Sequence, residues 1–411
     1  MKKITFIIAQ YGDKVNGGAE KHCQMLAQKM SSYYEIEVLT TCCIDYNTFE
    51  EFYSPGTECY DNICVRRFKT NKYDSDIYKM YEKKIRIFRK VRRSIYRLGL
   101  SRILPFLNPV WQSQEKTETA YYRSHGFYSS DLLTYLEEYH QQSQAIILFS
   151  YLYPSTVFGS LISPEKTILI PTAHNESHLF RPIMAKLFNH VAHIAFNTHN
   201  EQELCRSLFG RHMAPHTVIG VGTDLASPTS LEYINNKFNL PSEYIMYFGR
   251  VADSKLDQLI PYFLSYKKKY PNNLKLVLTG KLYTKKVDHK DIVYTDFVSE
   301  AEKTALIQHA KLIINPSPHE SLSLLMLESM KLGKIVLVNG KSKVLKEHCI
   351  KSNGAAFYYE SKQDFIYKIH ELVNGNQENN SEAQKYIEEN YNWDIIIQKF
   401  RSLINRISEN N

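Results

Sequence analysis

The sequence predicts an α/β protein of two domains, each built on a parallel β-sheet that is covered by helices. Short apolar runs of strand length alternate with longer segments of helical length along most of the chain, and strands separated by helices form parallel sheets. A polar segment at 226–239, rich in Ser, Pro, Thr and Asn, reads as a linker that divides this series. At 411 residues the chain is also too long for one ordinary core.

The first half of the chain supplies seven expected strands. These are residues 4–9, 35–41, 63–68, 145–150, 167–171, 194–197 and 217–220. Helices are expected at 17–30, 77–98, 130–139 and 200–208. The apolar part of the N-terminal run is too short for a signal peptide, so it is interpreted as the first core strand.

The second half repeats the alternation after the linker. Strands are expected at 244–248, 274–279, 292–294, 311–314 and 334–338. Helices are expected at 255–270, 299–309, 321–332, 363–373 and 386–407, and Pro261 is expected to kink or restart the first of them. Two open sheets in tandem imply a cleft between the domains, with ligands outside the carboxyl ends of the strands.

The positive charge of the chain is concentrated in one segment. The formal net charge is +8, and residues 83–102 contain nine basic residues and no acidic ones. On a helical wheel Lys83, Arg86, Arg89, Lys90, Arg93 and Arg97 fall on one side, and Ile85, Ile87, Phe88, Val91, Ile95 and Leu98 largely on the other. Two hypotheses stay open: a helix lying on an anionic membrane surface, or a helix packed on its own domain with a solvated basic face. No nucleic-acid recognition motif accompanies it.

Cysteine usage and hydropathy predict a cytoplasmic protein, and the membrane hypothesis for the basic helix would make it peripheral on the inner face of the membrane. The seven cysteines are odd in number and scattered, which is typical of reduced thiols. Cys42, Cys43, Cys59 and Cys64 cluster loosely, but their spacing fits no zinc site, so buried thiols are expected. No apolar run reaches the roughly 18–20 residues of a membrane span.

The stretch 315–328 is the strongest candidate for a site. It reads as a strand, a turn and a helix with Glu320 at the turn, and the N–H groups and dipole of such a helix start suit an anion. Glu328 would lie roughly 12 Å along the helix, so the two carboxylates cannot flank one bond as in a glycoside hydrolase. They could contact opposite ends of one long anionic ligand. The alternative is a helix-terminal carboxylate and a solvated helix face.

Other candidates follow strands. Gly17 and Gly18 allow close approach of a ligand to the backbone or simply make a tight turn. Arg250 and Lys255 suit a diphosphate, or are solvated surface cations. His174 is in a loop, where a structural hydrogen bond is the alternative. Asp74 and Asp76 resemble a metal-binding pair, but helix capping explains them more simply.

Together these residues resemble the family 4 retaining glycosyltransferases of the GT-B fold along nearly the whole chain. The similar segments are the pair Gly17-Gly18, the His174 segment, Gly-Arg-x4-Lys at 249–255, Asp-Phe-Val-Ser at 296–299, Glu-x7-Glu at 320–328 and the last helix. Three departures from the family pattern are Leu256 and Ser321, where glycine is usual, and residues 221–224, which read Val-Gly-Thr-Asp. They affect the expected backbone path and sugar identity more than the reaction.

The resemblance implies a role for each matching residue. Arg250 and Lys255 would hold the donor diphosphate, Phe297 and Val298 would line the base pocket, and Glu328 would bind the ribose. Glu320 would contact the donor sugar, with N–H groups from Ser321, Leu322 and Ser323. His174, Gly17 and Gly18 would face the cleft from the acceptor-side domain. The residues expected to act in catalysis are Glu320, Arg250, Lys255 and His174.

The expected activity is retaining transfer from a UDP- or GDP-linked sugar to a hydroxyl of a glycan or lipid-linked acceptor, in surface polysaccharide or glycoconjugate synthesis. Neither a metal nor another cofactor is expected, because fixed cations face the leaving group. The domains are expected at 1–225, with a basic helical insert at 77–102, at 226–389, and as a helix at 390–411 that returns to the first domain. The alternatives are a nucleotide-sugar epimerase and a non-catalytic binding protein on the same scaffold.

Overall fold

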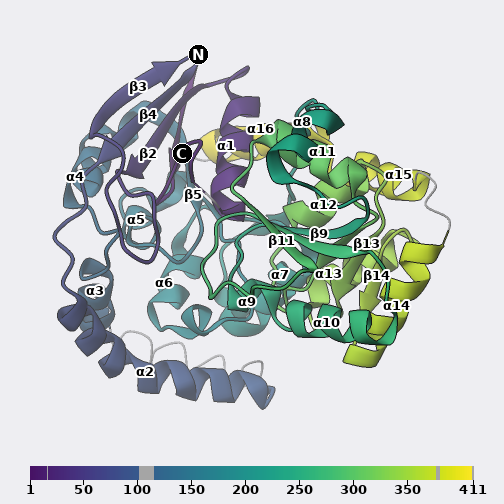
Figure 1. Ribbon diagram of the computed structural model, residues 1–411. Coiled ribbons are helices and arrows are strands. Elements are labelled where there is room, and N and C mark those ends of the chain that lie inside the picture. Colours follow the sequence, from purple (N-terminus) through teal and green to yellow (C-terminus); the bar gives the residue numbers. More distant parts are fainter. Residues whose placement is uncertain (16, 101–114, 376–379, 410–411) are drawn as a thin grey trace. The chain divides into compact units, whose positions relative to one another are not determined.

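The computed structural model describes residues 1–15, 17–100, 115–375 and 380–409, which fold into two compact α/β units (Figure 1). The first unit comprises Met1–Val221 and Asp394–Asn411, and the second comprises Gly222–Trp393. The chain therefore leaves the first unit once and returns to it. Within the described residues, no helix combines the length and the apolar character that crossing a membrane requires.

The sheet of the first unit has the strand order β3-β4-β2-β1-β5-β6-β7-β8. Its strands are β1 Lys3–Ile7, β2 Glu35–Thr41, β3 Gly56–Tyr60, β4 Ile63–Phe68, β5 Ser143–Phe149, β6 Thr167–Ile170, β7 His193–Phe196 and β8 His216–Val218. All neighbours are parallel except β3, which pairs antiparallel with β4 at the edge. The central strands are buried apolar runs, as the sequence predicted.

Helices cover this sheet and place the C-terminus on the first unit. They are α1 Gly18–Met30, α2 Ser75–Arg97, α3 Glu115–Arg123, α4 Ser130–Tyr139, α5 Pro154–Gly159, α6 Ile183–His190, α7 His199–Phe209 and α16 Trp393–Glu409. In α16, the guanidinium of Arg401 lies 4.2 Å from the centre of the Tyr33 ring. Ile396 packs against Gly220 at the end of the sheet.

The basic helix α2 does not have the two clean faces that the wheel predicted. Asp74 caps its start and accepts hydrogen bonds from the backbone N–H groups of Asp76 and Ile77, so capping explains this acidic pair. Ile85 is buried as expected, but Ile87 and Val91 on the same predicted side are exposed. Arg89 and Arg93, on the predicted basic side, are half-buried. The expected end of the insert at 102 lies outside the described residues.

The prediction of seven reduced thiols is wrong for two of them. Cys59 and Cys64 form a disulfide, because they are directly opposite each other in the antiparallel pair of β3 and β4. The strand β3 was not predicted, so this pairing could not be recognised. The other five cysteines, Cys23, Cys42, Cys43, Cys205 and Cys349, are buried free thiols.

The second unit contains an all-parallel sheet with the order β11-β10-β9-β12-β13-β14. Its strands are β9 Tyr244–Phe248, β10 Lys275–Thr279, β11 Ile292–Asp296, β12 Leu312–Asn315, β13 Val336–Asn339 and β14 Phe357–Tyr359. Its helices are α8 Leu231–Phe238, α9 Asp253–Leu256, α10 Leu259–Lys269, α11 Glu300–His309, α12 Leu324–Lys331, α13 Lys343–Lys351, α14 Lys362–Asn374 and α15 Ser381–Asn390.

Two predicted segments of the second half are corrected. The expected linker at 226–239 contains α8, which Ser230 caps and which buries Ile234. The expected helix at 386–407 is two helices, α15 and α16, separated at residues 391–392. Pro261 lies in the first turn of α10, where the missing N–H of proline costs no helical hydrogen bond.

Candidate donor site

The candidate site of the second unit lies where its central strands end. The strands β9 and β12 are parallel neighbours, so the turn with Arg250 and the loop with Glu320 leave the same edge of the sheet. The hydroxyl of Tyr247 donates to the backbone carbonyl of Arg250 at 2.9 Å. This bond fixes the turn that follows β9.

Glycines bring the loops after β9 and β10 into contact. Gly280 has a φ of +126°, and a side chain there would place its Cβ 1.9 Å from the carbonyl oxygen of Gly249. The backbone of Gly249 donates in turn to the Thr279 carbonyl at 3.0 Å. Only glycine tolerates both this conformation and this approach, so the Gly249-Arg250 turn is held close to the strand edge.

The structure brings Lys255 and Glu320 together. The Lys255 Nζ, on α9, lies 2.8 Å from the Glu320 Oε1, and both side chains are mostly buried. Burial raises the pKa of Tyr247, the charge of Glu320 adds to this rise, and the charge of Arg250 opposes it. The charges of Glu320 and Arg250 both act on the buried Tyr247 hydroxyl, so both residues lie near it.

Glu320 is in a loop, in keeping with the predicted turn, but the helix expected from 321 begins later. The helix α12 begins at Leu324, after the N-cap Ser323, whose hydroxyl accepts the N–H of Met326. The sequence contains no Gly or Pro between 321 and 324 to mark this shift. The estimate of 12 Å between Glu320 and Glu328 therefore does not apply, and Ser321 and Leu322 offer loop N–H groups.

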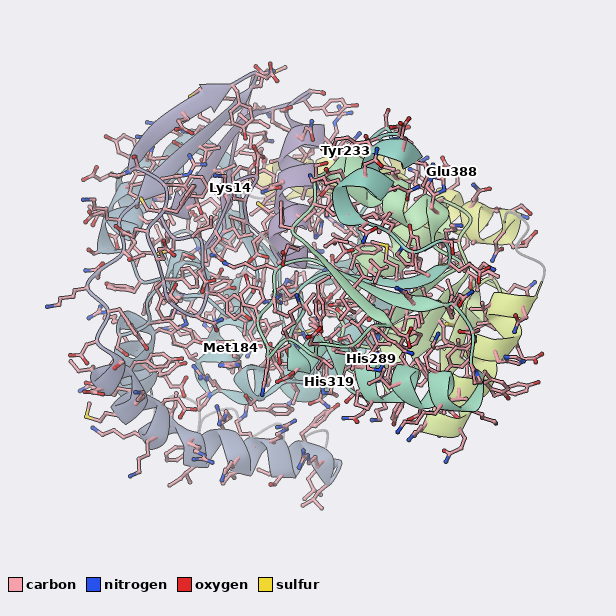
Figure 2. All side chains as sticks on the ribbon, viewed as in Figure 1. Lys14, Met184, Tyr233, His289, His319 and Glu388 are labelled. Carbon is pink, nitrogen blue, oxygen red and sulfur yellow. A yellow bond between two sulfur atoms is a disulfide. The ribbon has the colours of Figure 1, made fainter. Side chains whose placement is uncertain are left out.

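Two asparagines at strand ends hold this loop. The Asn315 side chain donates to the Ser323 hydroxyl at 2.8 Å and accepts the N–H of Ser317. The Asn339 side chain, at the end of β13, donates to the Pro316 carbonyl at 2.9 Å. His319, labelled in Figure 2, is an exposed member of the loop. The loop is therefore fixed at its base, with its tip at the surface of the unit.

Glu328 is buried, so the alternative of a solvated helix face is wrong. Its exposed fraction is 2%, and its Oε2 lies 2.7 Å from the Nζ of Lys303 on α11. Sequence reasoning missed Lys303. The i, i+3 spacing from Glu300 hinted at a surface ion pair only.

The loop before α11 presents an aromatic ring. Phe297 is 52% exposed, and Val298 beside it is half-buried. Ser299 caps α11 in a reciprocal pair with Glu302, which fixes the helix start next to the ring. An exposed phenylalanine at a strand end can stack on a flat heterocycle.

The remaining predicted residues belong to the first unit. Gly17 is the N-cap of α1 in an extended conformation, and Gly18 is its first residue. The Nε2 of His174 lies 3.5 Å from the Oε2 of Glu176, whose Oε1 accepts a hydrogen bond from the Tyr151 hydroxyl. These contacts make Glu176 an orienting partner of His174, which sequence reasoning did not identify.

A second histidine lies beside this carboxylate. The Nδ1 of His178 is 3.9 Å from the Oε2 of Glu176, and burial lowers the pKa of His178 to about 3. His178 is therefore neutral at physiological pH. Among the described residues, His, Cys, Asp and Glu nowhere gather in a group of three that could hold a metal ion.

Solved structures share this architecture over the whole chain. A sucrose-phosphate synthase from Thermosynechococcus elongatus superimposes with a TM-score of 0.68 at 13% identity, covering 100% of both chains. The chain has the GT-B fold. The Anabaena protein HepE, solved with UDP and glucose, gives a TM-score of 0.65 at 13% identity and covers 99% of this chain and 100% of its own.

A third GT-B match is an α,α-trehalose-phosphate synthase (UDP-forming) from Burkholderia vietnamiensis. Its TM-score is 0.66 at 10% identity, over 98% of this chain and 97% of that protein. At these identities the likeness concerns the fold, and it confirms the predicted fold class.

The family match in sequence lies within the second unit. Residues 242–375 match the family described as "Glycosyl transferases group 1". This range contains every donor-side candidate from Arg250 to Glu328. No curated protein matches the chain in sequence.

Proposed function

We propose that the protein is a retaining glycosyltransferase that moves a sugar from a UDP- or GDP-linked donor to a hydroxyl of a glycan or lipid-linked acceptor, in surface polysaccharide or glycoconjugate synthesis. The observation that carries this proposal is the pairing of Lys255 with Glu320, beside Arg250, where β9 and β12 end. The family match over 242–375 supports it.

The chemical task is to break a sugar–phosphate bond while negative charge develops on the departing nucleotide diphosphate. Arg250 can bind phosphate oxygens as a fork and Lys255 as a point charge. Both are already at the strand edge, so they stabilise the leaving group with little reorganisation. In this proposal they do so without a metal ion or another cofactor.

Glu320 has two tasks in this proposal. It holds the Lys255 ammonium at 2.8 Å before the donor binds, and its carboxylate contacts the donor sugar, where it stabilises positive charge on the ring in the transition state. The acceptor hydroxyl attacks from the face of the leaving group, which retains the configuration. We assign no covalent nucleophile.

The other assignments follow the same logic. The exposed ring of Phe297, with Val298, stacks on the nucleotide base. Glu328 accepts hydrogen bonds from the ribose hydroxyls. N–H groups of Ser321, Leu322 and Ser323 face the donor. His174, Gly17 and Gly18 serve the acceptor side and the donor phosphates.

UDP-glucose is the first donor to test, because HepE was solved with UDP-glucose and with UDP and glucose. The assay follows donor consumption with and without a glycan acceptor and reads the anomeric configuration by NMR. Arg250→Ala should lower kcat by about 10²–10³-fold, while Lys268→Ala, at the far end of α10, should not. Full donor turnover by Arg250→Ala would overturn the assignment.

The same assay decides between the alternatives. An epimerase converts the donor with no acceptor present. A non-catalytic binding protein binds the donor but neither transfers nor hydrolyses it. A transferase consumes the donor slowly alone and rapidly with its acceptor.

We also propose that α2 places the enzyme on an anionic membrane, on the cytoplasmic face. Ile87 and Val91, on the predicted apolar side, are exposed in the structure, as is Leu98 beyond the end of the helix. Lys83 and Lys90 are exposed as well. An exposed surface that is both apolar and basic suits the boundary of an anionic bilayer.

The membrane proposal has a matched control. Ile87 and Ile350 are equally exposed, at 66% and 67%, in different units. Ile87→Asp should reduce sedimentation with phosphatidylglycerol vesicles several-fold, and Ile350→Asp should not. Neutralising Lys83 and Lys90 should remove the salt-sensitive part of the binding. Equal sedimentation of all variants would contradict the proposal.

A further inference from the structure

Lys303 has contacts that exceed those of an ordinary helix lysine. Its Nζ lies 2.7 Å from the Glu328 Oε2 and 2.9 Å from the Glu300 Oε2. Its side chain is 14% exposed and that of Glu328 is 3% exposed. The pair with Glu328 joins α11 to α12, two helices that follow different strands.

The position of Lys303 connects it to three parts of the proposed donor site. It lies in the first turns of α11, a helix whose N-cap Ser299 directly follows Phe297 and Val298. Its ammonium contacts Glu328 on α12. Its Nζ also lies 5.6 Å from the centre of the Phe248 ring. Phe248 is the last residue of β9 and precedes the Gly249-Arg250 turn.

The two carboxylates stabilise the charged form of Lys303. Burial alone would lower the pKa of Lys303, but the charges and hydrogen bonds of Glu328 and Glu300 outweigh it and raise this pKa. A buried carboxylate stays ionised and ordered when a hydrogen-bonded cation faces it, and removal of that cation leaves a costly unpaired charge. Lys303 therefore restrains the Glu328 carboxylate through a contact of 2.7 Å.

We infer that Lys303 is a positioning residue of the donor site, which holds the Glu328 carboxylate in place for the ribose diol of the nucleotide. This inference rests on the proposed function. Because a carboxylate accepts from ribose hydroxyls, a nucleotide without its 2′-hydroxyl should bind more weakly. Loss of Lys303 should then reduce the distinction between ribose and deoxyribose, an effect that a purely structural lysine would not produce.

The test is calorimetric titration of the full chain with UDP and 2′-deoxy-UDP, and with GDP and 2′-deoxy-GDP. One of the two ribonucleotides, UDP or GDP, should bind better to the wild type. The Kd of its 2′-deoxy form should be about tenfold or more higher than its own. Lys303→Met should bring this ratio close to one, and Lys303→Arg should retain part of it. Lys237→Met removes another lysine that pairs with α11, through Glu302, and should leave the ratio unchanged.

The outcomes separate the inference from the proposed function. If the wild type binds no nucleotide, the proposed function fails. If it binds and prefers ribose but Lys303→Met keeps the wild-type ratio, the inference alone is overturned. If it binds with no ribose preference, the inference and the proposed ribose contact of Glu328 are both overturned, while donor binding stands. Should Lys303→Met fail to fold, Lys303→Met/Glu328→Gln leaves no unpaired charge between the two helices. It should bind UDP as weakly as Glu328→Gln, and a further tenfold loss would contradict the inference.

Discussion

The buried carboxylate of Glu118 should make the stability of the protein depend on pH. Glu118, on α3, is 0% exposed. Burial raises its pKa from 4.5 to about 7, although the positive charges of Arg181 and Arg92 lower it. The folded protein therefore holds a proton on this group at pH values where the unfolded chain has lost it.

The sign and the size of the pH dependence of stability follow from this difference in pKa between the folded and unfolded states. A carboxyl with a raised pKa in the folded state stabilises fully below its unfolded pKa, and the contribution is lost as the pH rises through the folded value. A rise from 4.5 to about 7 corresponds to about 3.5 kcal/mol in full, at about 1.4 kcal/mol per pKa unit. The loss should extend from about pH 4.5 to above pH 7.

Glu118→Gln is the perturbation, because glutamine is neutral at every pH. Urea unfolding at pH 4, 6 and 8 should show the variant gaining about 3 kcal/mol relative to the wild type across this range. Glu138→Gln, at an exposed position of α4, is the matched control and should follow the wild type. Parallel stability curves for the wild type and Glu118→Gln would refute the reasoning.

Three further predictions concern the site and the edge of the first sheet. Lys255→Met should lower kcat by about 10²-fold or more, and adding Glu320→Gln should cost less than the product of the two losses if the pair acts as a unit. Gly280→Ala should lower the thermal midpoint, by about 2 kcal/mol or more in free energy, because its Cβ would meet the Gly249 carbonyl. Cys59→Ser should destabilise the protein by about 2 kcal/mol, seen in thermal unfolding, with one additional free thiol by titration. An unchanged midpoint for either would contradict its prediction.

Buried strands were predictable from the sequence because they are continuous apolar runs, as in β9 and β12. The strand β3 was not, since all its residues are exposed and it has neither an apolar run nor alternation. Its disulfide was missed for the same reason. The helix α8 was hidden by the polar composition of residues 226–239, where Ile234 is the one buried residue of the helix.

The donor-side residues were identified from their sequence, but not their relations. Lys255 and Glu320 were predicted as separate ligand contacts, and the structure shows them as a pair, because the parallel order of β9 and β12 brings distant loops together. Lys303 could not be found from spacing, since its partner on α12 is set by helix packing. The late start of α12 is marked by the N-cap Ser323, whose hydroxyl also accepts a hydrogen bond from Asn315 across the turn.

The first and last residues of the second unit contact each other. The N–H of Thr223 donates to the Tyr391 carbonyl at 3.0 Å, and the Lys331 ammonium donates to the Thr223 carbonyl at 2.6 Å. Trp393 packs its indole on Gly222, where a Cβ would lie 2.3 Å from the ring. Residues 222–393 are thus an inserted module with adjacent ends, which suits expression as an independent fragment or transplantation into another host loop.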